Sequence, residues 1–210
     1  MMKPPTPPPN RYEHAPKLPE GEQIDVRSLV QGEWIELEIG PGRGGFMMER
    51  ALAEPRVGLV GFEVKRKWAT IVDARLKKAG FGSRARVFAE DALFAMPRLV
   101  PDGSVRVVYL HFPDPWWKKR HQKRLVMGDK FLEEVARLLC EGGQLFVQTD
   151  VEERAEQYET AIANSGRFTA NGDAPDSPRI AENPFGARSP REHRAIGDGL
   201  PVYRMLYRKR

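Results

Sequence analysis

Cysteine is almost absent from this sequence, because Cys140 is the only one among 210 residues. A single cysteine excludes an internal disulfide framework and a zinc site built from cysteines. Histidine is scarce too, and the four histidines are scattered with no pair at the spacing of metal ligands. We therefore expect no metal centre and no metal-dependent chemistry.

Long apolar runs are missing as well. No segment approaches the roughly 20 apolar residues that cross a bilayer, and the N-terminus lacks the apolar core of a secretory signal. We therefore expect a soluble, cytoplasmic protein. With 210 residues, of which 40% are hydrophobic, the chain is long enough for one good core.

The N-terminal segment has little apolar periodicity and much proline. Five of the first nine residues are proline, and Pro16 and Pro19 follow. Proline fixes φ and removes a backbone donor, which favours extended, solvated chain. We predict a disordered, proline-rich tail over residues 1–30 and one catalytic domain over residues 31–210. The alternative for the tail is a docking ligand for another domain.

Positive charge exceeds negative charge, giving a formal net charge of +5. The excess is concentrated in residues 118–124, where five of seven side chains are cationic. Such a run indicates a polyanionic partner, although a solvated surface loop has the same composition.

Strand and helix patterns alternate from residue 34 onward. A strand over 34–39 runs into a glycine-rich turn and a helix over 46–53, which is a strand, turn and helix unit. The pattern predicts further strands over 57–63, 86–89, 105–112, 144–149 and 202–208. It predicts further helices over 65–78, 129–140 and 151–165, and a long loop region over 170–200. This alternation is typical of an α/β fold with a doubly wound, mostly parallel sheet covered by helices on both faces.

Acidic residues stand at or near the carboxyl ends of five consecutive strands. Ligands of open parallel sheets bind at this edge. Gly40, Gly42 and Gly44 allow the backbone to pass close to a ligand, and Glu63 lies at the spacing of an acid that binds ribose hydroxyls. This pattern fits a dinucleotide or S-adenosylmethionine. The five acids are Glu38, Glu63, Asp91, Asp114 and Asp150.

Two of the acids favour S-adenosylmethionine over a dinucleotide. A pyrophosphate requires a helix N-terminus without nearby anions, whereas Glu38 comes directly before the glycine turn, where it suits the cationic methionine moiety. Asp91 stands where an acid contacts the edge of an adenine.

The segment from His111 to Arg124 carries the most specific motif. Pro113 and Pro115 bracket Asp114 in a rigid turn, two tryptophans follow, and the cationic run comes next. The segment Phe112-Pro113-Asp114-Pro115-Trp116 with its basic run resembles the tRNA (guanine-N7)-methyltransferase family. Residues 38–44, 61–64 and 149–150 are similar to other motifs of that family.

The resemblance implies the Rossmann-like class I methyltransferase fold and transfer of a methyl group from S-adenosylmethionine to guanine N7 in tRNA, at position 46 of the variable loop. It implies cofactor contacts at Glu38, Gly40, Gly42, Gly44, Glu63, Asp91 and Asp114. It implies substrate contacts at Lys118, Asp150, Ser189 and Glu192, and RNA contacts at Lys119, Arg120, Lys123 and Arg124. In the family's Thr-x-x-Glu motif, serine replaces threonine here, and Pro190 and Arg191 depart from the usual pattern.

The chemistry suits these residues. Guanine N7 has a free lone pair, so methyl transfer is a direct displacement that needs positioning and no general base. We expect Asp114 to be the catalytic residue, which accepts from guanine N1–H and the amine and favours the positive charge on the base. Trp116 and Trp117 are candidates for stacking on the base or for the core. His111 is equally compatible with a core position and with the site.

Other functions are compatible with parts of the pattern. A nicotinamide-dependent oxidoreductase accounts for the glycine turn and Glu63, but it leaves the Asp-Pro-Trp-Trp segment unexplained. An RNA-binding module with a methyltransferase fold accounts for the basic run but does not need the cofactor acids. The partners we expect are tRNA and no membrane or metal, and the sequence is compatible with a monomer and with a homodimer.

Overall fold

The structure, a computed structural model, describes residues 12–113 and 127–210. Its main sheet confirms the predicted doubly wound, mostly parallel α/β fold. Strand β10 (Tyr203–Lys209) runs antiparallel to its neighbours, while the first five strands in the order given next are parallel to one another. The order across the sheet is β4 (Ala85–Phe88), β3 (Val57–Phe62), β2 (Trp34–Ile39), β6 (Val105–His111), β7 (Leu139–Thr149), β10 and β8 (Phe168–Ala170), with β9 (Arg179–Ile180) paired to β10.

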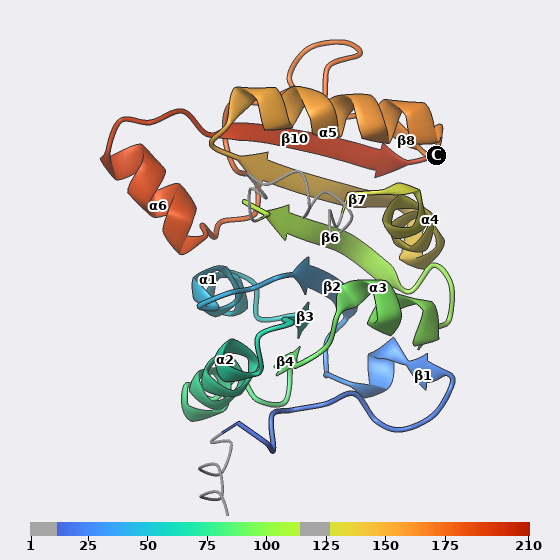
Figure 1. The fold of residues 1–210 in the computed structure, drawn as a ribbon, viewed down its shortest axis with the longest axis vertical. Coiled ribbons are helices and arrows are strands. Elements are labelled where there is room, and N and C mark those ends of the chain that lie inside the picture. Colours follow the sequence, from blue (N-terminus) through green and yellow to red (C-terminus); the bar gives the residue numbers. More distant parts are fainter. Residues whose placement is uncertain (1–11, 114–126) are drawn as a thin grey trace, which may run out of the picture.

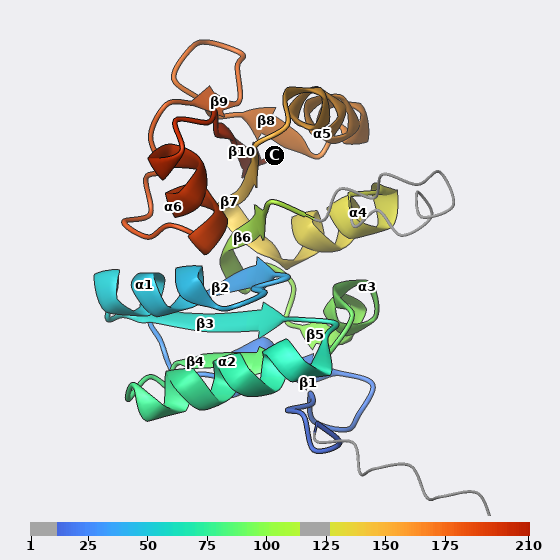
Figure 2. The same cartoon turned by 60° about the vertical axis from the view of Figure 1, so that its left-hand side comes forward.

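Helices cover both faces of the sheet, as Figure 2 shows. Met47 and Val72, from the helices α1 and α2, pack together over β3 and β4. On the opposite face, Phe131 and Ile162 of α4 and α5 pack in the larger core cluster. One face carries α1 (Gly45–Ala53), α2 (Arg66–Lys78) and α6 (Pro190–Gly197), and the other carries α3 (Ala92–Ala95), α4 (Asp129–Leu138) and α5 (Glu152–Ser165).

The segment before β2 differs from the predicted tail. Leu18, Val26 and Val30 are buried in the core, and β1 (Ile24–Asp25) pairs with β5 (Leu99–Val100). A 3-10 helix, η1 (Val26–Ser28), follows β1. The expectation of a disordered tail is therefore wrong for residues 12–30, while residues 1–11 lie outside the described residues. Proline favours extended chain, and the apolar side chains spaced along this segment reach the core.

The connection between α4 and β7 also differs from the prediction. The sequence predicts a helix over residues 129–140 that is stopped by the glycines Gly142 and Gly143. In the structure α4 ends at Leu138, and β7 begins at the next residue. Gly142 has φ +68° and lies where β7 shifts its register against β6. Glycine inside a strand is typical of a bulge, so these glycines mark an irregularity in the strand.

The expected long loop over 170–200 contains two further elements, β9 and α6. Ser189 is the N-cap of α6, its hydroxyl accepts from Glu192 N, and Pro190 follows at the first helical position. A helix commonly begins with a serine N-cap, a proline at the next position and a glutamate three residues after the serine. The high content of glycine and proline on either side obscured it. The prediction also omitted α3, β5 and the 3-10 helix η2 (Met96–Arg98).

Candidate functional site

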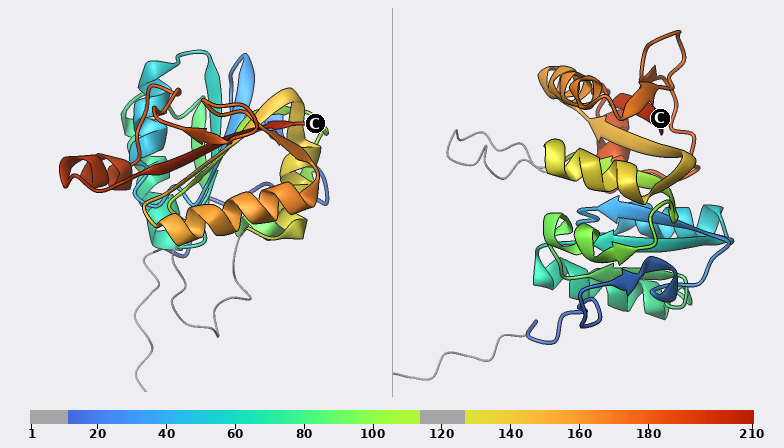
Figure 3. Two further views of the ribbon diagram at one scale, coloured as in Figure 1. Left: turned by 90° about the horizontal axis from the view of Figure 1, so that it is seen from above. Right: turned by 90° about the vertical axis from the view of Figure 1, so that its right-hand side faces the viewer.

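The carboxyl ends of the parallel strands bring four of the predicted acids to one edge of the sheet. Glu38 lies near the end of β2, and Glu63 directly follows β3. Asp91 follows β4 after two intervening residues, and Asp150 directly follows β7. In Figure 1, α6 stands beside the tips of β6 and β7 at this edge. The view from above in Figure 3 shows α6 projecting from that end of the molecule.

The glycine turn between β2 and α1 requires its glycines. Gly40, Gly42 and Gly44 have φ values of +71°, +54° and +73°, a region that side chains with a Cβ rarely adopt. A Cβ on Gly44 would lie 2.2 Å from Val72 Cγ1. The turn is therefore held close to α2, and its backbone is exposed to a ligand at Gly40 and Gly42, where a Cβ would meet nothing closer than 3.9 Å.

Glu63 ties the glycine turn to the next strand. Its side chain is 5% exposed, Oε2 accepts from Gly42 N at 3.0 Å, and Oε1 accepts from Lys65 N at 2.9 Å. A carboxylate has about four acceptor sites, so two remain for further donors. This arrangement fits the hydroxyl pair of a ribose placed over the glycine turn.

Glu38 and Asp91 occupy different environments. Glu38 is 2% exposed, and its Oε1 lies 2.9 Å from His111 Nδ1 on β6. Asp91 is exposed and caps α3, where its side chain accepts from Leu93 N at 3.0 Å. Glu38 is therefore an inner residue of the site and Asp91 an outer one.

Asp150 is joined to Arg191 of α6 by a bidentate ion pair. Arg191 Nε lies 3.0 Å from Oδ2 and Nη2 lies 3.0 Å from Oδ1. The guanidinium also lies 5.5 Å from the centre of the Phe112 ring, which is a cation–π distance. Arg191, whose role the sequence left open, thus reaches the acid that was expected to contact the substrate.

The two outer residues of the C-terminal motif face inward. Ser189 caps α6, and Glu192 is fully buried. Glu192 Oε1 accepts from Arg204 Nε at 3.0 Å, and Oε2 accepts from Asn183 Nδ2 at 3.0 Å. These hydrogen bonds hold both side chains at the start of α6, the helix that carries Arg191, and the substrate contacts expected of Ser189 and Glu192 stay predictions.

The C-terminal segment docks on α1, the helix that begins at the glycine turn. A Cβ on Gly45 would lie 2.5 Å from Pro190 Cγ, so only glycine allows this approach. Glu49 Oε2 accepts from Arg188 N at 2.8 Å, and its Oε1 lies 2.7 Å from His193 Nε2. The glycine turn and the C-terminal motif are therefore both attached to α1.

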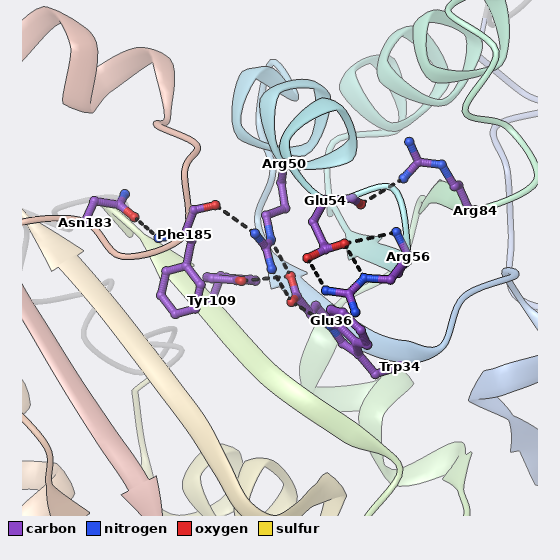
Figure 4. Close-up of polar contacts among 9 residues, drawn as sticks. All are labelled: Trp34, Glu36, Arg50, Glu54, Arg56, Arg84, Tyr109, Asn183 and Phe185. Atoms are coloured by element: carbon purple, nitrogen blue, oxygen red, sulfur yellow. Dashed lines mark hydrogen bonds and ion pairs between the residues drawn. The ribbon is translucent and has the colours of Figure 1, made fainter.

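A buried polar cluster strengthens this docking (Figure 4). Arg50 donates to Glu36 from Nε at 2.9 Å and to Phe185 O from Nη1 at 2.8 Å, while Tyr109 Oη donates to Glu36 at 2.8 Å. Burial opposes the charge on Arg50, yet hydrogen bonding to Glu36 leaves the pKa of Arg50 above its ordinary value. Burial and the charge of Glu36 raise the pKa of Tyr109 well above its usual range, so Tyr109 stays protonated. Sequence reasoning missed this cluster, because its members come from distant parts of the chain.

The predicted catalytic turn is described only at its start. Phe112 has φ +44°, and non-glycine residues with such a value are concentrated at functional sites. The remaining predicted residues of this region lie outside the described residues: Asp114, Trp116, Trp117, Lys118, Lys119, Arg120, Lys123 and Arg124.

The described parts of the chain lack two further features. Over residues 12–113 and 127–210, no helix is long and apolar enough to span a bilayer. Over the same ranges, no group of three or more His, Cys, Asp or Glu side chains is arranged to hold a metal ion.

Comparison with known proteins gives a consistent picture. A family model described as "Putative methyltransferase" matches residues 33–205. A tRNA (guanine-N(7)-)-methyltransferase of Myxococcus xanthus is 36% identical over 170 residues, which cover 81% of each chain. The tRNA (guanine-N(7)-)-methyltransferase of Anaeromyxobacter dehalogenans is 39% identical over 175 residues, covering 83% of this chain and 85% of the relative.

Solved structures with the same fold are more distant in sequence. The 16S rRNA methyltransferase KamB superposes with a TM-score of 0.57 at 17% identity, covering 87% of this chain and 90% of that one. The [4+2]-cyclase SpnF superposes with a TM-score of 0.58 at 15% identity, covering 88% of this chain and 78% of that one. Since these two proteins have different activities, this likeness concerns the fold alone.

Proposed function

This chain belongs to the tRNA (guanine-N7)-methyltransferase family, and we propose that it transfers the methyl group of S-adenosylmethionine to N7 of a guanine in tRNA. One observation carries the proposal beyond family membership. The glycine turn, Glu63 and Glu38 meet at one edge of the sheet, with a direct hydrogen bond from Gly42 N to Glu63. This arrangement suits a nucleoside with a cationic side chain.

Each part of the cofactor has a partner of suitable chemistry. The two free acceptor sites of Glu63 suit the ribose hydroxyls, and the exposed Asp91 suits the adenine edge. Glu38 suits the methionine moiety, because an anion next to the turn favours a cation and repels a pyrophosphate. When bound, S-adenosylmethionine supplies an electrophilic methyl group.

The chain's own residues position the methyl acceptor. The bond to N7 forms as the bond from carbon to sulfur breaks, and the positive charge passes to the guanine, so no proton has to be removed. Asp114 accepts from guanine N1–H and the amine and stabilises this charge. Asp150, which directly follows β7, assists Asp114, and Arg191 fixes the orientation of Asp150 through the two hydrogen bonds.

The partner is tRNA, and we propose position 46 of its variable loop as the target. The basic run supplies phosphate contacts, which hold the RNA without reading its sequence. A tRNA substrate is consistent with a protein that works in the cytoplasm.

The decisive experiment is incubation of the full chain with unmodified tRNA and labelled S-adenosylmethionine, followed by nucleoside analysis. We expect label in 7-methylguanosine and a strong loss of label for Asp150→Asn. Asp102→Asn is the matched control, because Asp102 pairs with Arg137 away from this edge of the sheet and is 68% exposed. Tight binding of a nicotinamide dinucleotide without methyl transfer would support the oxidoreductase alternative and overturn the proposal.

A further inference from the structure

Two buried acids on β2 are each held by a residue of β6. Glu36 accepts from Tyr109 Oη at 2.8 Å, and Glu38 Oε1 lies 2.9 Å from His111 Nδ1. Side chains two residues apart on a strand lie on the same face, so the two pairs stand side by side. Glu36 and Glu38 are 1% and 2% exposed, so neither carboxylate is solvated by bulk water.

The two acids differ in their remaining partners. Glu36 also accepts from Arg50 on both oxygens, at 2.9 and 2.7 Å, and from Trp34 Nε1 at 3.0 Å. Among the described residues, Glu38 is hydrogen-bonded to His111 alone, and its Oε2 is buried without a hydrogen-bond partner. A buried carboxylate oxygen without a donor is costly. No cation of the described residues pairs with Glu38 in the way that Arg50 pairs with Glu36.

Three aromatic rings surround the imidazole of His111. Its ring centre lies 4.3 Å from that of Phe46, 5.5 Å from that of Tyr109 and 5.8 Å from that of Phe146. We assign the donor role in this bond to His111 Nδ1–H and the acceptor role to the Glu38 carboxylate. The cage of three aromatic rings fixes the imidazole, the imidazole occupies Oε1, and Oε2 is the oxygen left for a ligand.

We propose that His111 is a positioning residue that acts on the cofactor through Glu38. His111 donates to Oε1 of Glu38 and leaves Oε2 for the ammonium group of the methionine moiety. This ammonium group has three donors and a positive charge. The sulfonium is not the group recognised here, because it carries no N–H. This inference rests on the cofactor assignment of the proposed function and adds a residue that the glycine turn and the strand-end acids do not include.

The test compares two ligands that differ in the amino-acid moiety. S-adenosylhomocysteine has the ammonium group, and 5′-methylthioadenosine lacks it. His111→Phe keeps an aromatic ring in the cage but removes the donor. We expect calorimetry to show about a 10- to 100-fold weaker binding of S-adenosylhomocysteine, the range of a hydrogen bond to a charged group. Binding of 5′-methylthioadenosine should change by less than about twofold.

Two further variants separate positioning from structure. His111→Asn places an amide N–H near the position of Nδ1, so it should restore most of the affinity for S-adenosylhomocysteine. Tyr109→Phe removes the equivalent donor to Glu36, which keeps Arg50 and Trp34, and should leave both affinities unchanged.

The outcomes are distinguishable. Equal weakening of both ligands by His111→Phe, or no weakening of either, overturns the role of His111 while the cofactor assignment stands. A wild-type protein that binds neither ligand overturns the cofactor assignment itself and this inference with it.

Discussion

The two ion pairs at the first turn of α6 should differ widely in their contribution to stability. Glu192 is fully buried and its partner Arg204 has a side chain that is 10% exposed, whereas Arg191 and Asp150 are 42% and 20% exposed. Breaking a buried pair by removing one partner costs about 3–5 kcal/mol, because a charge remains buried. An exposed pair contributes about 0–1 kcal/mol.

We therefore expect Glu192→Gln to lower the free energy of unfolding by about 3–5 kcal/mol, a large part of the ~5–15 kcal/mol of a typical domain. The glutamine keeps one acceptor, but its amide group meets the Asn183 donor and leaves Arg204 without a counter-charge. Arg191→Gln should change stability by less than about 1 kcal/mol.

Urea denaturation followed by circular dichroism measures both values by linear extrapolation. Methylation of tRNA is measured on the same samples below the transition. We expect Arg191→Gln to lose activity while it remains folded, since it releases Asp150. A loss of less than about 1 kcal/mol for Glu192→Gln, or an equal loss for Arg191→Gln, would refute the assignment of a structural pair and an active-site pair.

Three further predictions concern the rest of the site. Asp114→Asn should lower the single-turnover rate by about 10²–10³, the effect of removing one preorganised transition-state contact, and near-normal methylation would transfer the catalytic role to Asp150. Deletion of residues 1–11 should leave binding of S-adenosylhomocysteine unchanged, whereas deletion of residues 1–20 should weaken it, because Pro16 O accepts from Ala89 N at 2.6 Å, two residues before Asp91; equal calorimetric affinities would contradict this. Neutralising four cations of the basic run should flatten the salt dependence of tRNA binding by about 0.9 in log–log slope per lost contact on duplex RNA, and an unchanged slope would identify the run as a solvated surface. These four cations are Lys119, Arg120, Lys123 and Arg124.

The sequence predicts the parts of the molecule that depend on local patterns. The glycine turn after β2 was predicted because its spacing and its conformational requirement are both local. Continuous apolar segments such as Val57–Phe62 predict a strand covered on both faces. The strand-end acids were found for the same reason, since the end of a strand is a local feature.

The contacts that complete the site are not local. Arg191 and Asp150 are 41 residues apart, and Glu38 and His111 are 73 residues apart. Neither pair has a spacing that indicates contact until the order of the strands is known. The docking of residues 12–30 was missed because proline lowers the expectation of structure and because the partners of this segment are distant in sequence. Pro16 O accepts from Ala89 N, and β1 pairs with β5.

Helix α1 contacts both parts of the proposed site, the glycine turn and the C-terminal motif. Its first residue, Gly45, continues the glycine turn, and Glu49 and Arg50 hold the segment that presents Arg191. A displacement of α1 by either ligand therefore changes the free energy of binding the other. By thermodynamic linkage the effect is reciprocal, so the factor by which bound tRNA changes cofactor affinity equals the factor by which bound cofactor changes tRNA affinity. Such coupling would appear as a cofactor affinity that depends on the concentration of tRNA.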